Sequence, residues 1–208
     1  MHNRKGDVII SAVLVAGITI ALISVAIVWG GPIIEKSSSS TTLLTVQNLI
    51  EDINERTEEI ANSESGEFTL NIPIGSAELI AYDSGDPPGS NNITLVFPVT
   101  QPVATPGQVV FLGATTFKDI SEEIGTYGQS SPFIVTLVLE PTSSGFLARL
   151  TTHSRELETD NERFIIVFEE GASVGGEGSI NIRFDRVDTD FSGGGKPLVK
   201  LVHKVNIF

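Results

Sequence analysis

The pattern of apolar and polar residues divides the chain into three parts, of which the first is almost wholly apolar. Residues 8–29 contain no charged side chain, and nothing there is more polar than serine or threonine. At about 1.5 Å per residue, this run would form a helix roughly 33 Å long, and a bilayer's hydrocarbon core is about 30 Å thick. We therefore predict a transmembrane helix near the N-terminus.

The second part is predicted to contain a break and then an amphipathic helix. Residues 30–32, Gly-Gly-Pro, favour a kink or a short joint, because glycine is a poor helix former and proline lacks an N–H. Residues 37–42, Ser-Ser-Ser-Ser-Thr-Thr, would form a short linker, or Thr41 or Thr42 would cap the next helix. Residues 43–60 carry an apolar stripe at helical spacing, made of Leu43, Val46, Ile50, Ile53 and Ile60, with Thr57 in the missing place.

This stripe has two interpretations. It packs on the β domain of its own chain, or part of it also meets neighbouring subunits, because a sustained pattern of this kind suits helix bundles. Residues 62–66, Asn-Ser-Glu-Ser-Gly, are expected to end the helix.

The third part alternates with period two and predicts about nine short strands. Turn-rich segments such as residues 83–91 and 171–178 separate them, and a short helix is allowed at residues 116–123. The fold class is therefore α+β, with a long hydrophobic helix followed by an antiparallel β-sandwich or barrel near the immunoglobulin-like type. The expected strands are residues 67–72, 77–82, 93–99, 108–112, 133–139, 146–152, 163–168, 179–184 and 198–207.

Charge is distributed unevenly along the chain. The formal net charge of -13 divides into +1 for residues 1–36 and -14 for residues 37–208. Arg4 and Lys5 before the apolar run favour a cytoplasmic N-terminus, which puts the acidic domain outside the membrane. A domain of this sign repels phosphate backbones, which argues against nucleic acid as a partner. The chain has no cysteine, so a disulfide and a thiolate metal site are both excluded.

Few residues suggest chemistry, and we expect no catalytic residues, no cofactor and no metal. The histidines His2, His153 and His203 are far apart in sequence, and His203 lies on the apolar face of the last strand. A calcium ion bound by Asp185, Asp188 and Asp190 is the one candidate metal site, although the spacing fits no EF-hand loop. Asn92 begins the only Asn-x-Ser/Thr sequon and is a candidate glycosylation site.

The N-terminus resembles the class III signal peptide of the archaeal type IV pilin-like superfamily, which includes archaellins and adhesion pilins. The features that carry the resemblance are Arg4-Lys5-Gly6, then Asp7, then the uninterrupted apolar run. It implies that a prepilin peptidase cuts between Gly6 and Asp7 and that the hydrophobic helix stays with the mature protein. Ser11 replaces the glutamate that bacterial pilins carry five residues after the cut. The family also pairs its N-terminal helix with an immunoglobulin-like domain.

The predicted organisation is a leader at residues 1–6, a transmembrane or filament-core helix at 7–31, a linker and amphipathic helix at 32–62, and the β domain at 63–208. The resemblance implies a structural subunit of a surface filament, which is membrane-inserted before it assembles as a homopolymer. Whether such a filament swims or adheres to surfaces stays open. Small residues that would let the helices approach closely are Ser11, Ala12, Ala16, Gly17, Ala21 and Ala26.

Three alternatives remain. The apolar run would also serve as a signal anchor that is never cut. A non-polymerising accessory protein, of a stator or envelope-binding kind, would keep its helix in lipid and use residues 30–42 as a flexible tether. A membrane-anchored hydrolase ranks lowest, because the sequence offers no paired nucleophile and base.

Overall fold

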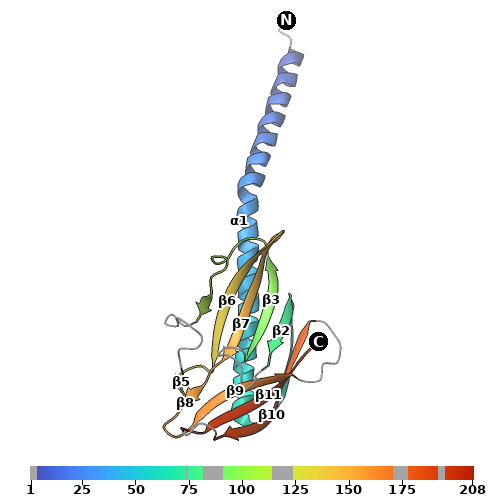
Figure 1. Cartoon of the computed structure of the whole chain (residues 1–208). Coiled ribbons are helices and arrows are strands. Elements are labelled where there is room, and N and C mark those ends of the chain that lie inside the picture. Colours follow the sequence, from blue (N-terminus) through green and yellow to red (C-terminus); the bar gives the residue numbers. More distant parts are fainter. Residues whose placement is uncertain (1–3, 74, 82–90, 114–123, 171–177, 192–194) are drawn as a thin grey trace.

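A computed structural model of the chain consists of one long helix and a β domain built around its C-terminal half (Figure 1). The structure describes residues 4–73, 75–81, 91–113, 124–170, 178–191 and 195–208. For residues 4–14 and residue 80 it describes the backbone alone.

Helix α1 extends from Arg4 to Ser63 without interruption, so the short joint allowed at residues 30–32 is absent, while the kink allowed there stays a prediction. Pro32 lies inside this helix and costs it one backbone hydrogen bond, that of its own missing N–H. Since turns already formed on both sides remove the cost of nucleation, one lost bond does not end the helix. The proposed linker at residues 37–42 is likewise helical.

Hydroxyl groups of the serine and threonine run form hydrogen bonds within the helix. Thr41 Oγ1 donates to the carbonyl of Ser37 at 2.9 Å, and Thr45 Oγ1 donates to that of Thr41 at 3.0 Å. Side chains that bond to the carbonyl four residues earlier leave the helical N–H groups undisturbed. A contact between Ser39 and the β domain, described below, also holds this segment, so tertiary contacts outweigh its weak propensity.

The helix ends where the sequence predicts, through a backbone cap. Ser65 N–H donates to the Ile60 carbonyl and Glu64 N–H to the Ala61 carbonyl, both at 3.2 Å. Glu64 adopts a φ of 50° and Gly66 a φ of 111°. This arrangement is the Schellman motif, which turns the chain sharply into the first strand.

Eleven strands lie within the described residues, and they form two sheets. The six-stranded sheet has the order β1-β10-β11-β9-β8-β5, and the five-stranded sheet has the order β2-β3-β7-β6-β4. The strands are β1 (Glu67–Asn71), β2 (Ser76–Ile80), β3 (Asn92–Val99), β4 (Val110–Leu112), β5 (Gly125–Thr126), β6 (Phe133–Thr142), β7 (Gly145–Ser154), β8 (Leu157–Glu158), β9 (Arg163–Glu170), β10 (Ser179–Asp190) and β11 (Leu198–Ile207).

All nine expected strands are present, and β6, β7 and β10 extend beyond their expected ends. The two short strands β5 and β8 were not predicted, because two residues carry no alternation. The helix allowed at residues 116–123 lies outside the described residues. Most of the turn-rich segments at 83–91 and 171–178 lie outside them too.

The prediction of a purely antiparallel domain is wrong in the six-stranded sheet, which is mixed. β11 pairs with β9 in parallel, and β5 pairs with β8 in parallel, whereas the other pairs are antiparallel. β10 does not pair with β9, and the next strand, β11, lies between them. Because β11 runs antiparallel to β10, it runs parallel to β9. The period of apolar residues along a strand does not show whether its neighbour runs parallel or antiparallel.

Both sheets and the C-terminal half of α1 share one hydrophobic core. Val46, Ile50, Ile53 and Ala61 are at most 3% exposed, and they lie in the same core as side chains from both sheets, such as Leu150 and Ile182. Thr57 fills the missing place in the stripe and donates its hydroxyl to the Ile53 carbonyl at 2.6 Å. Truncation of a buried isoleucine to alanine at such a position costs about 2–5 kcal/mol.

His203 lies on the core face of β11, as predicted, and is completely buried. Its Nδ1 is 2.9 Å from the Leu201 carbonyl, and its ring meets Phe184 edge to face at 5.5 Å. A neutral ring that donates from Nδ1 leaves Nε2 as an acceptor, and Nε2 has no hydrogen-bond partner in the described structure. Desolvation by burial lowers the pKa of His203 from 6.5 to about 4.

The shifted pKa of His203 predicts a loss of stability in mild acid. Between pH 6.5 and about 4 the unfolded chain binds a proton at this site while the folded chain does not. The free energy of unfolding should therefore fall by about 3 kcal/mol over this window because of His203. A His203→Leu variant should lose about 3 kcal/mol less stability than the wild-type chain over the same pH window. Denaturant unfolding of both full chains in detergent micelles measures the difference. Parallel curves for the two proteins would contradict the assignment.

Candidate functional site

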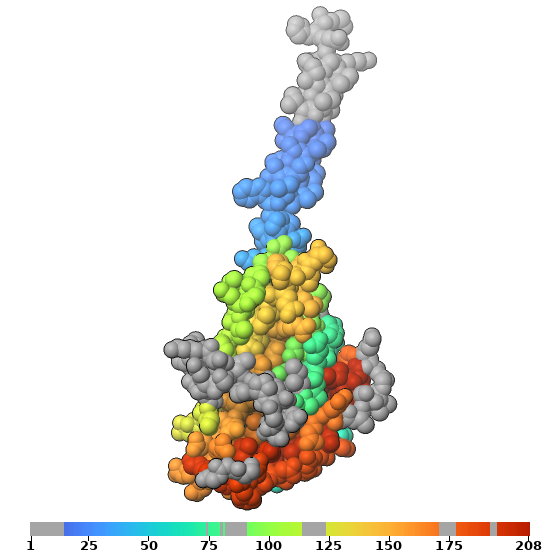
Figure 2. Space-filling view, in the orientation of Figure 1, coloured from blue at the N-terminus to red at the C-terminus, as the bar shows by residue number. Residues whose placement is uncertain are grey.

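The N-terminal half of α1 protrudes from the β domain and is the most exposed apolar surface among the described side chains (Figure 2). Its large side chains are between 54% and 76% exposed, with Trp29 at the upper limit. They lie on all sides of the helix, because their positions between Val15 and Ile34 do not keep to one helical face. By length and composition this is the one described helix that could cross a membrane.

The predicted small residues lie on more than one side of the protruding half. At about 100° per residue, Gly17 and Ala21 share one side, while Ala16 and Ala26 lie on the other. A side chain added at Gly17 would find no atom within 4 Å, so contacts inside the chain do not explain this glycine. The side chains of Ser11 and Ala12 lie outside the description.

A polar contact fixes the point where the protruding half enters the domain. Ser39 is 3% exposed, and its Oγ accepts from the Gln101 backbone N–H and lies 3.1 Å from Thr100 Oγ1. One turn earlier, Glu35 accepts a hydrogen bond from Gln101 Nε2 at 2.9 Å. We call these four residues the helix clasp, because they tie α1 to the segment that follows β3.

Sequence analysis did not identify the helix clasp. Ser39 is one of four successive serines, and its neighbours Ser38 and Ser40 are exposed. Its partners Thr100 and Gln101 lie more than 60 residues away in sequence. A single sequence has no signal for such a pairing.

Below the clasp, the apolar stripe of α1 is buried in the chain's own domain, as the first of the two interpretations predicts. The opposite side of this half is polar, with exposed Glu51 and Glu55 and an ion pair of 2.7 Å between Asp52 and Arg56. On that side Leu44 is a large apolar residue with 59% of its surface exposed. The core stripe itself is therefore not available for contacts between subunits.

The predicted cleavage site lies at the start of α1. Gly6 and Asp7 fall within its first two turns, and the helix begins at Arg4. The bond between them is thus in the part of the molecule farthest from the β domain (Figure 1). Cleavage at this bond stays a prediction.

Asn92, the candidate glycosylation site, is the first residue of β3 and is 4% exposed. Its Oδ1 accepts a hydrogen bond of 3.4 Å from the Thr94 hydroxyl of the same sequon. A glycan on this side chain would require the amide to leave its place beside the sheet. Occupancy stays a prediction, and the fold makes modification before folding the easier route.

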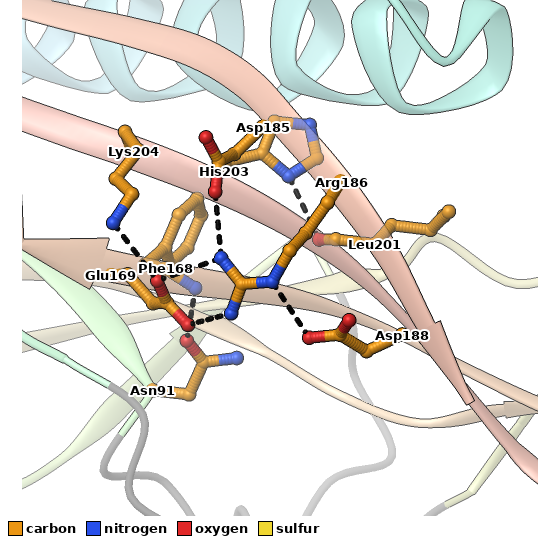
Figure 3. Close-up of polar contacts among 9 residues, drawn as sticks. All are labelled: Asn91, Phe168, Glu169, Asp185, Arg186, Asp188, Leu201, His203 and Lys204. Carbon is orange, nitrogen blue, oxygen red and sulfur yellow. Dashed lines mark hydrogen bonds and ion pairs between the residues drawn. The ribbon is translucent and has the colours of Figure 1, made fainter. Parts of the chain in front are cut away.

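The three aspartates proposed for calcium are engaged with basic side chains instead, and Figure 3 shows two of them, Asp185 and Asp188, beside Arg186. Arg186 binds Asp185 at 2.6 Å and Asp188 at 2.9 Å, and Asp190 lies 3.4 Å from Lys200. Among the described residues, no three histidine or acidic side chains converge on a common point that suits a metal ion. The prediction overlooked Arg186, which lies between these aspartates in sequence.

Arg186 also reaches across β11 to β9, two strands away in the six-stranded sheet. It binds Glu169 of β9 at 2.7 Å, and Lys204 of β11 approaches the same carboxylate at 3.2 Å. These hydrogen bonds, with that from Arg186 as the larger influence, lower the pKa of Glu169. The network therefore ties three adjacent strands together on the outer face of the six-stranded sheet.

The histidine that lies beside serine in sequence forms a hydrogen bond across the five-stranded sheet. His153 Nε2 is 3.0 Å from Thr136 Oγ1, and both residues are under 10% exposed within the five-stranded sheet. The pair joins neighbouring strands β6 and β7. This hydrogen bond therefore links two strands of the five-stranded sheet.

Comparisons of the chain with protein-family models, with curated proteins and with solved structures gave no match. The functional conclusions for this chain therefore come from its own residues.

The helix clasp predicts an unequal response of neighbouring serines to mutation. Ser39→Ala removes the acceptor of a partly buried N–H and should lower the free energy of unfolding by about 1–2 kcal/mol. Ser38→Ala, at an exposed position one residue away, should change it by less than about 0.5 kcal/mol. Denaturant unfolding of both full chains in detergent micelles measures the difference. Equal effects of the two substitutions would show that the contact contributes nothing.

Proposed function

We propose that this chain is a structural subunit of an archaeal type IV pilus-like surface filament, either an archaellum or an adhesion pilus. The observation that carries the proposal is the protruding half of α1, which is apolar on every side and continuous with a helix fixed in the β domain. Such a surface is unstable in water and needs either lipid or other apolar helices around it. Copies of the same helix would provide the second environment.

The proposed sequence of events follows from these two environments. The precursor is inserted with its N-terminus in the cytoplasm, and a prepilin peptidase cuts between Gly6 and Asp7. The helix then exchanges lipid for copies of itself, with close packing at small residues in place of lipid contacts. Contacts that do not close a ring build an open helical fibre, and the acidic β domains, outside the cell, keep it hydrated.

The immunoglobulin-like assignment of the β domain is part of this proposal. Two sheets that share one core support a sandwich of this general kind. The parallel pairs β9–β11 and β5–β8 depart from the fully antiparallel arrangement.

The shape of α1 favours this proposal over a non-polymerising accessory protein. That alternative uses residues 30–42 as a flexible tether between membrane and domain. The segment is helical instead, and the helix clasp holds its lower part. A stiff connection suits a subunit whose helix must hold its domain at a constant orientation in a fibre.

The direct test is N-terminal sequencing of appendages sheared from cells, with electron microscopy of the same sample. We expect thin filaments that contain this chain beginning at Asp7. A chain found solely in membranes, beginning at Met1 and not assembled, would reject the proposal.

Gly17 provides a second test, which separates assembly from folding. A Cβ at position 17 would meet no atom of the single chain within 4 Å, and Gly17→Leu raises helix propensity by up to about 1 kcal/mol, so the chain should still fold. In a filament the larger side chain should keep neighbouring helices apart, and the yield of sheared filaments should fall at least about tenfold. Ile18→Leu, at the adjacent exposed position, is the matched control and should assemble normally. Undiminished assembly of Gly17→Leu would exclude close helix contacts at this position.

A further inference from the structure

A hollow of about 360 Å³ lies between the last turns of α1, the segment after β5, and residues of β8, β9 and β11. Its apolar lining includes Ala61, Leu157 and Ile166, all under 10% exposed. Its polar lining comes from α1, from the segment after β5 and from the turn between β7 and β8, and includes Glu58, Asn62, Gln129, Ser130 and Arg155. The size is near the lower end of the range of about 300–1,000 Å³ for small-molecule sites.

Backbone hydrogen bonds hold the wall of this hollow in place. Tyr127 N–H donates to the Glu158 carbonyl at 3.1 Å, and Ser130 N–H donates to that of Thr126 at 2.9 Å. Arg155 is held at both ends, since its N–H donates to the Pro132 carbonyl and its Nε to the Ser131 carbonyl. The hollow is therefore formed before any ligand arrives, which lowers the entropy cost of binding.

Close packing beside the hollow supports the same conclusion. A Cβ added at Gly125 would lie 2.7 Å from Leu157 Cδ2 and 2.8 Å from Ser130 Cβ. The absence of a side chain at Gly125 is what lets the wall segment approach β8. The fold thus uses a glycine to bring Ser130 and the neighbouring Tyr127 beside the apolar floor.

An aromatic pair forms one side of the hollow. The ring centroids of Tyr127 and Phe164 are 4.8 Å apart, with the planes tilted by 36°. Phe164 thereby fixes the orientation of Tyr127, which is 47% exposed. A fixed, exposed ring offers an apolar face to a ligand at little entropic cost.

The polar groups of the lining are mixed in kind and balanced in charge. The Glu58 carboxylate accepts hydrogen bonds, a guanidinium donates them, and the amides of Asn62 and Gln129 do both. Glu58 and Arg155 are the charged members of the lining, so their charges cancel. A balanced lining on a strongly acidic domain does not attract anions, and it suits an uncharged ligand with several hydroxyl groups.

We propose that this hollow binds one or two units of a neutral saccharide. A pyranose ring has a C–H face that packs on an aromatic ring and hydroxyl groups that both donate and accept hydrogen bonds. The lining offers a matching aromatic face at Tyr127 and matching polar groups around it. This site does not rest on the proposed filament function, since the dispersed chain contains all of its residues.

The test uses the full chain in micelles of a detergent that has no sugar head group. Maltose, cellobiose, lactose and diacetylchitobiose are the neutral probes, with glucuronic acid as the charged comparison, followed by saturation-transfer NMR and titration calorimetry. We expect at least one neutral disaccharide to bind and glucuronic acid to bind more weakly. Tyr127→Ala should weaken binding at least about tenfold, while Tyr127→Phe should retain it. Phe191→Ala, at an aromatic residue that is 78% exposed and outside the hollow, is the control and should bind normally.

Absence of binding by all four neutral probes would overturn the inference. So would unchanged binding by Tyr127→Ala, or equally tight binding of glucuronic acid. Gln129→Ala, at an exposed polar position, is a second variant that keeps the test valid should Tyr127→Ala fail to fold. A chain that assembles into filaments without binding these sugars would remove this site and leave the proposed function intact.

Discussion

Burial of the apolar stripe on α1 is the contact on which the rest of the structure depends. Val46, Ile50, Ile53 and Ala61 fill the core that both sheets share, so neither sheet has a complete core without them. The stripe also determines which side of the helix faces outward. Domain folding and helix orientation are therefore one event, and a change that loosens the core also loosens the hold on the protruding half.

The same helix has to satisfy two different surroundings. Below Ser39 it behaves as the core helix of a soluble protein, with one apolar stripe and an acidic outer side. Above Glu35 it is apolar on every side and needs a solvent other than water. The change happens within about one turn, and the helix clasp lies at that turn. The helix clasp therefore lies at the boundary between the apolar, exposed half of α1 and the half that packs in the β domain.

Local patterns in the sequence predicted most of the secondary structure but little of its pairing. The alternation of Phe68, Leu70 and Ile72 identified a strand, and the spacing of Val46, Ile50 and Ile53 identified the buried helix face. The parallel pairing of β9 with β11 could not be predicted, because it depends on a crossover. Of the kink or short joint expected at Pro32, the joint is absent, because turns already formed on both sides carry the helix through this residue.

The candidate sites show the same division. The exposed apolar helix follows directly from composition, whereas the burial of Asn92 and the pairing of Asp185 and Asp188 with Arg186 depend on neighbours brought together by folding. The contact of Ser39 with Gln101 and the hollow beside Tyr127 each join distant segments of the chain. Local patterns in a single sequence do not predict contacts between segments that are far apart in the chain.

The uninterrupted course of α1 has a geometric consequence for how a subunit's two halves are coupled. In a continuous helix each residue adds about 1.5 Å and about 100° of rotation. Adding or removing one residue between Pro32 and Ser38 would therefore turn the β domain by about 100° about the helix axis relative to the apolar segment. The number of residues in this stretch, more than their identity, sets the angular phase between the buried and the outward-facing parts of the molecule.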